Sequence, residues 1–181
     1  MRSFKCEGIV IKRINYGESD RIVSIFTKEF GKLVFSAKGV RKITSHRSPH
    51  IELLNHSLIT AYRSSSYPIL IEAAVQEDYS SIKEDLEKVG FAYHICELVD
   101  GLCPEGQENE EVFFLLKDVL LKLSSSEEIA AFIHEFEINL LTNLGFWRGS
   151  PELAERLDTR SFVENILERR LKSKRIFSQI D

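Results

Sequence analysis

The sequence is short of the residues on which several protein classes depend. Its 181 residues include only three cysteines, Cys6, Cys96 and Cys103, and these form no CxxC pair. An odd, widely spaced set is a poor disulfide framework and a poor zinc site, so we expect buried thiols and no metal. No apolar run approaches the length of a membrane span, and the charged start does not suit a signal peptide. We therefore expect a cytoplasmic protein with no membrane partner.

Recognisable catalytic motifs are also missing. There is no glycine-rich phosphate loop of either common type, no GxSxG nucleophile motif and no HExxH metal motif. His46, His50 and His56 lie close together in the sequence, but no carboxylate or thiol stands beside them at ligand spacing. We therefore predict that the protein is not an enzyme and that it needs no cofactor.

Charge is distributed unevenly along the chain. The net charge is only −4, which by itself argues weakly against binding to nucleic acid. However, residues 1–63 hold 12 lysines and arginines against 5 acidic residues, whereas residues 64–181 hold 12 against 23. Such an asymmetry indicates a basic binding module followed by an acidic module that solvates the protein or faces a partner.

The first eighty residues have the pattern of a small β domain. In the segment 32–38, Leu33, Phe35 and Ala37 alternate with Lys32, Val34, Ser36 and Lys38, which is the period of a half-buried strand. Turn residues separate five such segments at short spacing, which favours a closed or sandwiched sheet over alternating strands and helices. The five expected strands are Ile9–Ile11 (ending at Tyr16-Gly17), Arg21–Thr27, Lys32–Lys38, Ile51–Tyr62 and Ile69–Val75.

The pattern changes to a helical period near residue 80. Three Ser-x-x-Glu sequences, beginning at Ser81, Ser125 and Ser161, resemble capping boxes that open helices. Apolar residues then recur at steps of three and four, and Gly145 has the place of a residue that ends a helix. We therefore expect two domains, a β domain at residues 1–79 and an all-helical domain at residues 80–181.

A basic stretch with interleaved aromatics gives the best indication of function. The sequence Lys38-Gly39-Val40-Arg41-Lys42 places three cations around one glycine, where a loop can approach a phosphate backbone closely. Small β-barrels of the OB type hold single strands by a basic groove and stacking aromatics. Phe35 has the position of a core residue, whereas Tyr16 is compatible with either role. The aromatics interleaved with the cations are Phe4, Tyr16, Phe35, Tyr62 and Tyr67.

An ordered set of short motifs resembles the amino-terminal domain of the RecO family. The motifs are GIVIKR at residues 8–13, YGESDRIV at 16–23, FT at 26–27 and AKGVR at 37–41. The Leu144-Gly145-Phe146 segment resembles the end of the family's long helix, so the resemblance covers most of the chain. It implies an OB-fold five-stranded barrel followed by an all-helical domain.

The resemblance also implies a function. RecO-like proteins are recombination mediators in DNA repair: they bind single- and double-stranded DNA and anneal strands coated by single-strand-binding protein. With RecR they help to load the recombinase RecA, so these proteins become expected partners, and a nucleoid-associated location follows. In the YGESDR motif, we expect Glu18 and Asp20 to have structural roles in a turn. The family's basic DNA-contacting face maps to Arg13, Arg21, Lys38, Arg41, Lys42 and Arg47.

One departure concerns the carboxyl-terminal part of the chain. Many family members carry a cysteine-rich zinc module after the Leu-Gly-Phe segment, whereas residues 146–159 contain no cysteine here. We therefore expect the zinc module to be absent and a final helix to end in a basic cluster. A partner such as the acidic tail of single-strand-binding protein would bind the cations Arg169, Arg170, Lys172 and Arg175.

Two alternatives remain open at this point. The first is an RNA-binding OB-fold protein, which a comparison of DNA with RNA affinity would separate from a DNA-binding protein. The second is a non-catalytic adaptor whose basic face meets an acidic protein. The salt dependence of DNA binding separates this alternative, because an adaptor would show little DNA binding at any salt concentration.

Overall fold

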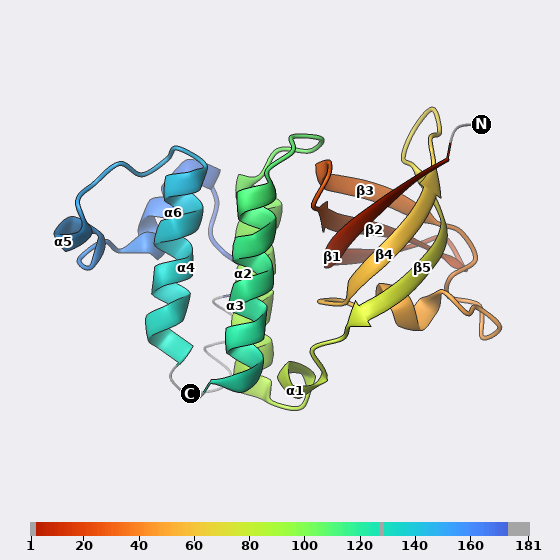
Figure 1. Ribbon diagram of the computed structural model, residues 1–181, viewed down its shortest axis with the longest axis horizontal. Helices are drawn as coiled ribbons and strands as arrows, with labels where there is room; N and C mark the ends of the chain where they lie inside the picture. Colours follow the sequence, from red (N-terminus) through yellow and green to blue (C-terminus); the bar gives the residue numbers. More distant parts are fainter. Residues whose placement is uncertain (1–2, 127–128, 174–181) are drawn as a thin grey trace. The chain divides into compact units, whose positions relative to one another are not determined.

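The computed structural model describes residues 3–126 and 129–173, and Figure 1 traces the chain. It divides into two compact units, which we describe separately. The first consists of residues 1–79 together with 103–113, and the second of residues 80–102 together with 114–181. The first unit contains the five strands, and the second contains most of the helical residues.

Five strands form a closed barrel in the order β1-β2-β3-β5-β4. Neighbouring strands are antiparallel except β3 and β5, which are parallel and pair through Ser36 and Ile69. All five strands that the alternating pattern predicted are present. The strands are β1 (Ser3–Tyr16), β2 (Asp20–Thr27), β3 (Gly31–Ala37), β4 (His56–Tyr62) and β5 (Ile69–Glu77).

The fourth strand begins later than the sequence predicted. The expected strand Ile51–Tyr62 was wrong over its first part, because Ser48–Ile51 forms a short 3-10 helix, η1, and β4 starts only at His56. Pro49 stands in the first turn of η1, where its fixed φ suits a helical turn. The side-chain amide of Asn55 donates to the carbonyl of Pro49 (2.8 Å) and ties the turn to the start of the strand.

The barrel core follows the predicted alternation. Phe35 and Ala37 are fully buried, and Leu33 packs against the same cluster from a partly buried position. Val23 lies opposite Phe35 in the neighbouring strand and is also fully buried. A register shift between Val10 and Lys12 lets the long strand β1 pair with β4 through its first half and with β2 through its second half. Such irregularities bend a strand, as closure of a small barrel requires.

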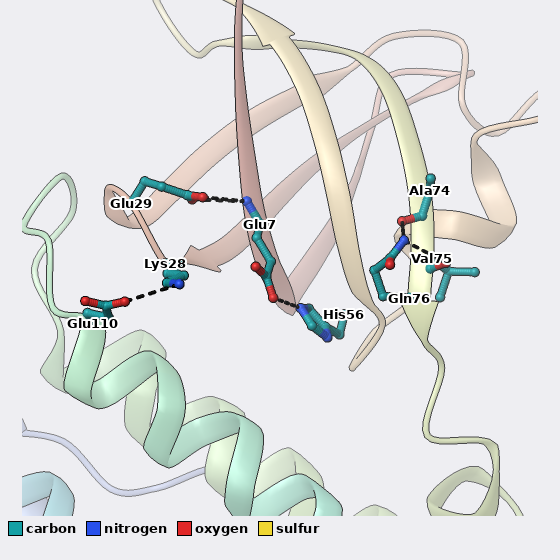
Figure 2. Close-up of polar contacts among 8 residues, drawn as sticks. All are labelled: Glu7, Lys28, Glu29, His56, Ala74, Val75, Gln76 and Glu110. Carbon is teal, nitrogen blue, oxygen red and sulfur yellow. Dashed lines mark hydrogen bonds and ion pairs between the residues drawn. The ribbon is translucent and has the colours of Figure 1, made fainter.

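Residues 103–113 lie beside the barrel although they follow α2 (Leu86–Leu102) in sequence. Glu105 pairs with Lys32 at the start of β3, and the Gly106 N–H donates to the Lys32 carbonyl (2.8 Å). Figure 2 shows a further link, in which Lys28 contacts Glu110 (3.3 Å) at the start of α3 (Glu110–Ser125). Gly31 permits this approach, because its φ is +63° and an added Cβ would lie 1.8 Å from the Gln107 carbonyl oxygen.

The helix that was expected to run from Ser81 is interrupted. Residues Ser80–Lys83 form a single turn, α1, and α2 begins only at Leu86. The carboxylate of Asp85 accepts the backbone N–H groups of Glu87 (2.9 Å) and Lys88 (3.2 Å). Asp85 therefore caps α2, and the predicted cap at Ser81 was wrong; a carboxylate immediately before the helix meets its free N–H groups directly.

The other two predicted capping boxes were also misplaced. Ser125 is the last residue of α3, and its hydroxyl donates to the carbonyl of Leu121 (3.1 Å); Glu128 lies outside the described residues. The last described helix, α6 (Thr159–Leu167), is capped by Asp158, which accepts the Ser161 N–H (3.1 Å). In contrast, Gly145 has the predicted left-handed conformation, with a φ of +79°. It follows α4 (Ile129–Asn143), and the short α5 (Pro151–Ala154) comes next.

A cluster of buried polar side chains lies inside the helical unit. The Nε2 atom of His94 lies 2.5 Å from the carboxylate of Glu137, and its Nδ1 atom lies 3.0 Å from the Ser173 hydroxyl. The Thr159 hydroxyl donates to the other oxygen of Glu137. His94, Glu137, Thr159 and Ser173 are all buried, and these hydrogen bonds link their side chains into one network.

Candidate nucleic-acid interface

The loop that follows β3 presents three cations to solvent. Lys38, Arg41 and Lys42 are exposed, whereas Val40 between them is fully buried and belongs to the barrel core. Gly39 has a φ of +67°, a conformation that favours glycine and turns the chain sharply after the strand. The sequence pattern correctly placed these three cations on one short loop, and the buried valine fixes that loop to the barrel.

The loop 38–42 is bonded to the turn between β1 and β2. The backbone N–H of Arg41 donates to the Ser19 carbonyl (2.9 Å), and its guanidinium donates to the Gly17 carbonyl (3.0 Å). The Gly39 N–H donates to the carboxylate of Asp20 (2.7 Å). The YGESDR and AKGVR motifs, which are separate in the sequence, therefore form one structure. Asp20 has the structural role that was expected of it.

Asp20 is held in its charged form by this arrangement. The hydrogen bond from the Gly39 N–H lowers the pKa of the Asp20 carboxyl most. A hydrogen bond from the Ser19 hydroxyl and the charges of Lys38 and Lys42 lower this pKa further. The carboxylate is therefore ionised at neutral pH and balances part of the positive charge of the loop.

Arg47 holds the same loop from its other side. Its guanidinium donates to the carbonyl of Lys38 (2.7 Å) and to the carbonyl of Leu70 in β5 (2.8 Å). Arg47 thus links the end of β3 to a strand far away in sequence. Its charge lies next to the cationic loop, but both of its terminal nitrogens already donate to backbone carbonyls.

Arg13 and Arg21 are placed differently from the loop cations. Both contact the carboxylate of Glu52, Arg13 at 2.5 Å and Arg21 at 3.3 Å, and only 25% and 20% of their side chains are exposed. Arg21 also donates to the side-chain oxygen of Asn15 (3.2 Å). The sequence did not indicate Glu52, because it lies 31 positions from Arg21 and no local pattern connects the two.

Two apolar side chains near the loop are exposed. Tyr16, which ends β1, is 64% exposed, and Ile43, directly after the loop, is 105% exposed. Sequence reasoning left the role of Tyr16 open and missed Ile43.

The other aromatics of this part of the barrel are more buried. The expectation that Phe35 is a core residue was correct, since its side chain is fully buried. Phe4 is partly buried and packs edge-on against Phe30, with a centroid distance of 5.5 Å. Tyr16 is therefore the exposed aromatic that adjoins the turn carrying Gly17.

The cations near the carboxyl terminus do not end a helix. α6 stops at Leu167, and Glu168 has a left-handed φ of 52°, so the expected basic helix end was wrong. Arg169 pairs with Glu97 of α2 (2.9 Å). Glu97 also accepts the backbone N–H groups of Lys172 (2.8 Å) and Ser173 (2.9 Å). The side chains of Arg170 and Lys172 are exposed, and Arg175 lies outside the described residues.

The polar cluster of the helical unit contains the residue types of a hydrolytic triad, but in a buried setting. His94 is hydrogen-bonded to both Ser173 and Glu137, yet Ser173 is 2% exposed and His94 is 5% exposed. A substrate cannot reach a serine that is covered in this way. The cluster instead joins residue 173 to α2 and α4.

A metal site is not formed by the residues that the structure describes, since no group of three or more potential ligands comes together among them. Cys6, Cys96 and Cys103 are each buried as free thiols. Burial raises the pKa of the Cys6 and Cys96 thiols to about 12, so both are protonated at neutral pH. Protonated thiols are poor ligands and poor nucleophiles.

Comparison with known proteins agrees with the motifs. The family model described as "Recombination protein O N terminal" matches residues 1–77, and "Recombination protein O C terminal" matches residues 83–147. The chain belongs to the RecO family. The first match covers all five strands, and the second includes residues 103–113 and ends just after α4.

Curated relatives carry the name "DNA repair protein RecO". The relative from Roseiflexus sp. is 33% identical over 154 residues, which is 85% of this chain and 53% of the relative. That from Listeria monocytogenes serotype 4b is 33% identical over 143 residues, 79% of this chain and 56% of the relative. The relative from Dehalococcoides mccartyi is 33% identical over 152 residues, which is 84% of this chain and 59% of the relative. The chain thus spans about half the length of these relatives. Among the described residues, no helix has the length and apolarity needed to cross a membrane.

Proposed function

We propose that this protein binds DNA through an OB-type barrel and acts without catalysis as a mediator in DNA repair and recombination. The observation that carries the proposal is the loop 38–42, which hydrogen bonds tie to the neighbouring turn and to Arg47. It presents Lys38, Arg41 and Lys42 to solvent while Val40 anchors it in the core. Fixed cations that replace the counterions of a phosphate backbone bind DNA of any sequence.

The contacts of each cation suggest a division of roles. Lys38 and Lys42 contact phosphates directly, and Arg41 does so while its guanidinium also holds the Gly17 carbonyl. Arg47 supports the loop. Arg13 and Arg21 both pair with Glu52, so they contribute a weaker positive electrostatic potential to the binding surface. The exposed ring of Tyr16 offers a surface for a base to stack on.

Strand annealing follows from the same electrostatics. Cations that neutralise the phosphates of two complementary strands reduce their mutual repulsion and favour pairing. The names of the relatives place the family in DNA repair, and we extend that role to this chain. The proposal includes strands coated by single-strand-binding protein, and loading of the recombinase RecA together with RecR.

The helical unit is proposed to contact a protein partner. An acidic tail, such as that of single-strand-binding protein, would meet the exposed side chains of Arg170 and Lys172. A groove of about 450 Å³ beside α4 and α5 is less suitable, because Glu135 and Glu155 line it together with Trp147. These carboxylates would repel an acidic tail.

The direct test of DNA binding is the double variant Lys38→Ala with Lys42→Ala. Loss of two phosphate contacts lowers the magnitude of the salt slope by about 1.4 on single strands and about 1.8 on duplex, whatever the sequence. A matched control is Arg148→Ala with Arg156→Ala, which removes two exposed cations from the helical unit. Affinity is measured by fluorescence anisotropy at several salt concentrations, with RNA as a second ligand.

The possible results separate the candidate functions. Equal DNA affinity of the Lys38/Lys42 variant and the wild type would exclude this loop as the DNA interface. Clear preference for RNA would favour a role in RNA metabolism. Negligible binding of either nucleic acid by the wild type would point to an adaptor. Annealing of complementary strands, with and without single-strand-binding protein, then tests the mediator role.

A further inference from the structure

The carboxylate of Asp20 lies among the cations of the proposed DNA interface. It belongs to the first residue of β2, directly after the 17–19 turn, and it is partly buried. The charges of Lys38 and Lys42 act on it. An acidic group on a surface that binds phosphate weakens that binding by simple repulsion. A physical reason for its presence must therefore outweigh this cost.

The hydrogen bonds of Asp20 supply such a reason. Its carboxylate oxygen accepts the Gly39 N–H at 2.7 Å, a short bond to a charged acceptor. Gly39 is the left-handed residue that turns the chain between Lys38 and Arg41. The same oxygen also accepts the Ser19 hydroxyl (3.1 Å), which fixes the orientation of the carboxylate.

Other contacts also support the loop 38–42, among them the buried side chain of Val40. On the hairpin side, the Arg41 N–H bonds the Ser19 carbonyl, and on the opposite side Arg47 bonds the Lys38 carbonyl. Asp20 holds the residue between these two points. Without it, Gly39 would lose the hydrogen bond that restrains its backbone, and binding would have to order this residue first.

We propose that Asp20 is a positioning residue that fixes the cationic loop for DNA, so that this negative charge strengthens the binding of a negative ligand. The inference rests on the proposed function for its consequence in DNA binding. Its structural half, the ordering of Gly39 by Asp20, is independent of any ligand.

Three single substitutions in the full chain provide the test. Each removes one negative charge, so the three variants have the same net charge. Asp20→Asn removes the charge but keeps an oxygen that can accept the Gly39 N–H. Asp20→Ala removes both. Glu18→Ala removes a carboxylate from the exposed turn next to it. Asp20→Ser, whose hydroxyl is one bond shorter, is a milder second variant in case the alanine protein does not fold.

We expect these substitutions to change the affinity for single-stranded DNA in opposite directions. Asp20→Asn and Glu18→Ala bind single-stranded DNA as tightly as the wild type or more tightly, because a repulsive charge is gone. Asp20→Ala binds about three- to tenfold more weakly than the wild type, the effect of one hydrogen bond to a charged group, and Asp20→Ser binds more weakly than the wild type by a smaller factor. If Asp20→Ala binds as tightly as Asp20→Asn, the positioning role is wrong and the carboxylate acts only by its charge.

Amide hydrogen exchange at Gly39, measured without DNA, separates the two proposals. We expect slow exchange in the wild type and in Asp20→Asn, and exchange at least about tenfold faster in Asp20→Ala. Equally fast exchange in the wild type and the alanine variant would overturn the positioning role even if DNA binds. Conversely, protection of Gly39 in a protein that binds no DNA would leave Asp20 as the organiser of the loop and refute the proposed function.

Discussion

Two regions of the molecule use a carboxylate in the same way but in different surroundings. In the barrel, Asp20 accepts the Gly39 N–H, 19 positions away, beside exposed cations. In the helical unit, Glu97 accepts the N–H groups of Lys172 and Ser173, 75 and 76 positions away, from a side chain that is only 13% exposed. The first carboxylate organises a surface loop, and the second joins a distant segment to a packed unit. Substitutions should therefore change ligand binding in the first case and stability in the second.

The largest effect is expected from Glu137→Ala in the buried polar cluster. The substitution removes the common hydrogen-bond partner of the buried His94 and Thr159 side chains. Breaking one side of a buried polar pair costs about 3 kcal/mol of unfolding free energy. Urea denaturation measures this loss. Glu135→Ala, an exposed neighbour on α4, should change stability by less than about 0.5 kcal/mol; similar losses for both would show that the cluster does not hold the unit.

A smaller loss is expected from Arg47→Ala in the barrel. Arg47 makes two hydrogen bonds to carbonyls of β5 and of the loop 38–42, and the group is partly exposed, so we expect about 1–2 kcal/mol. DNA affinity should also fall, because the loop loses its support. Lys42→Ala is the contrasting variant, with weaker DNA binding at unchanged stability. If both variants behave alike in urea denaturation and anisotropy, the distinction between supporting and binding cations fails.

Glu97→Gln should alter the pH dependence of stability. Burial of the Glu97 carboxyl opposes ionisation, but hydrogen bonds from the Lys172 and Ser173 N–H groups and from Arg169 lower its pKa below the usual 4.5. A folded-state pKa below the unfolded one contributes stability above the unfolded value, and this stability is lost as the pH falls through the folded value. Below about pH 4.5 the wild type should therefore lose more stability than Glu97→Gln does. Parallel urea curves from pH 7 to pH 3 would contradict this.

The smallest effect is expected where a buried polar atom has no partner at all. Within the described part of the chain, the Tyr79 hydroxyl is buried and makes no hydrogen bond. Burial raises the pKa of this phenol to about 12, so it stays protonated. Tyr79→Phe should therefore be neutral or slightly stabilising in thermal denaturation. A clear loss of stability would indicate that the hydroxyl has a partner, such as a bound water molecule.

The sequence predicted the elements of the barrel better than their connections. Alternation placed Leu33, Phe35 and Ala37 on the core face, because side chains of a strand point to opposite sides. It failed at residues 51–55, where Ile51 and Leu54 are buried in a turn rather than in a strand. Buried apolar residues do not by themselves distinguish a strand from a compact turn.

The candidate interface was predictable only where its residues are neighbours in sequence. The cations at 38–42 share one loop, and that much followed from the motif. The partners Glu52 and Leu70 did not, because they meet Arg13, Arg21 and Arg47 through the closure of the barrel. The helix starts were misplaced for a similar reason. Asp85 and Asp158 cap the helices in place of the nearby serines. Aspartate and serine are about equally good caps, so the capping-box pattern alone does not choose between them.

The attachment of residues 103–113 to the barrel has a consequence for synthesis of the chain. All five strands and the core cluster of the barrel lie before residue 79, but the segment that lies against the start of β3 is complete only when residue 113 leaves the ribosome. At about 5–20 residues per second, the delay is about 2–7 s. During that interval the start of β3 lacks its neighbour at Gly31, and α2 has emerged before α3 and α4. The nascent chain thus holds a barrel that is uncovered at Gly31 beside helices that are still incomplete, and a chaperone bound to the emerging polypeptide would meet both surfaces.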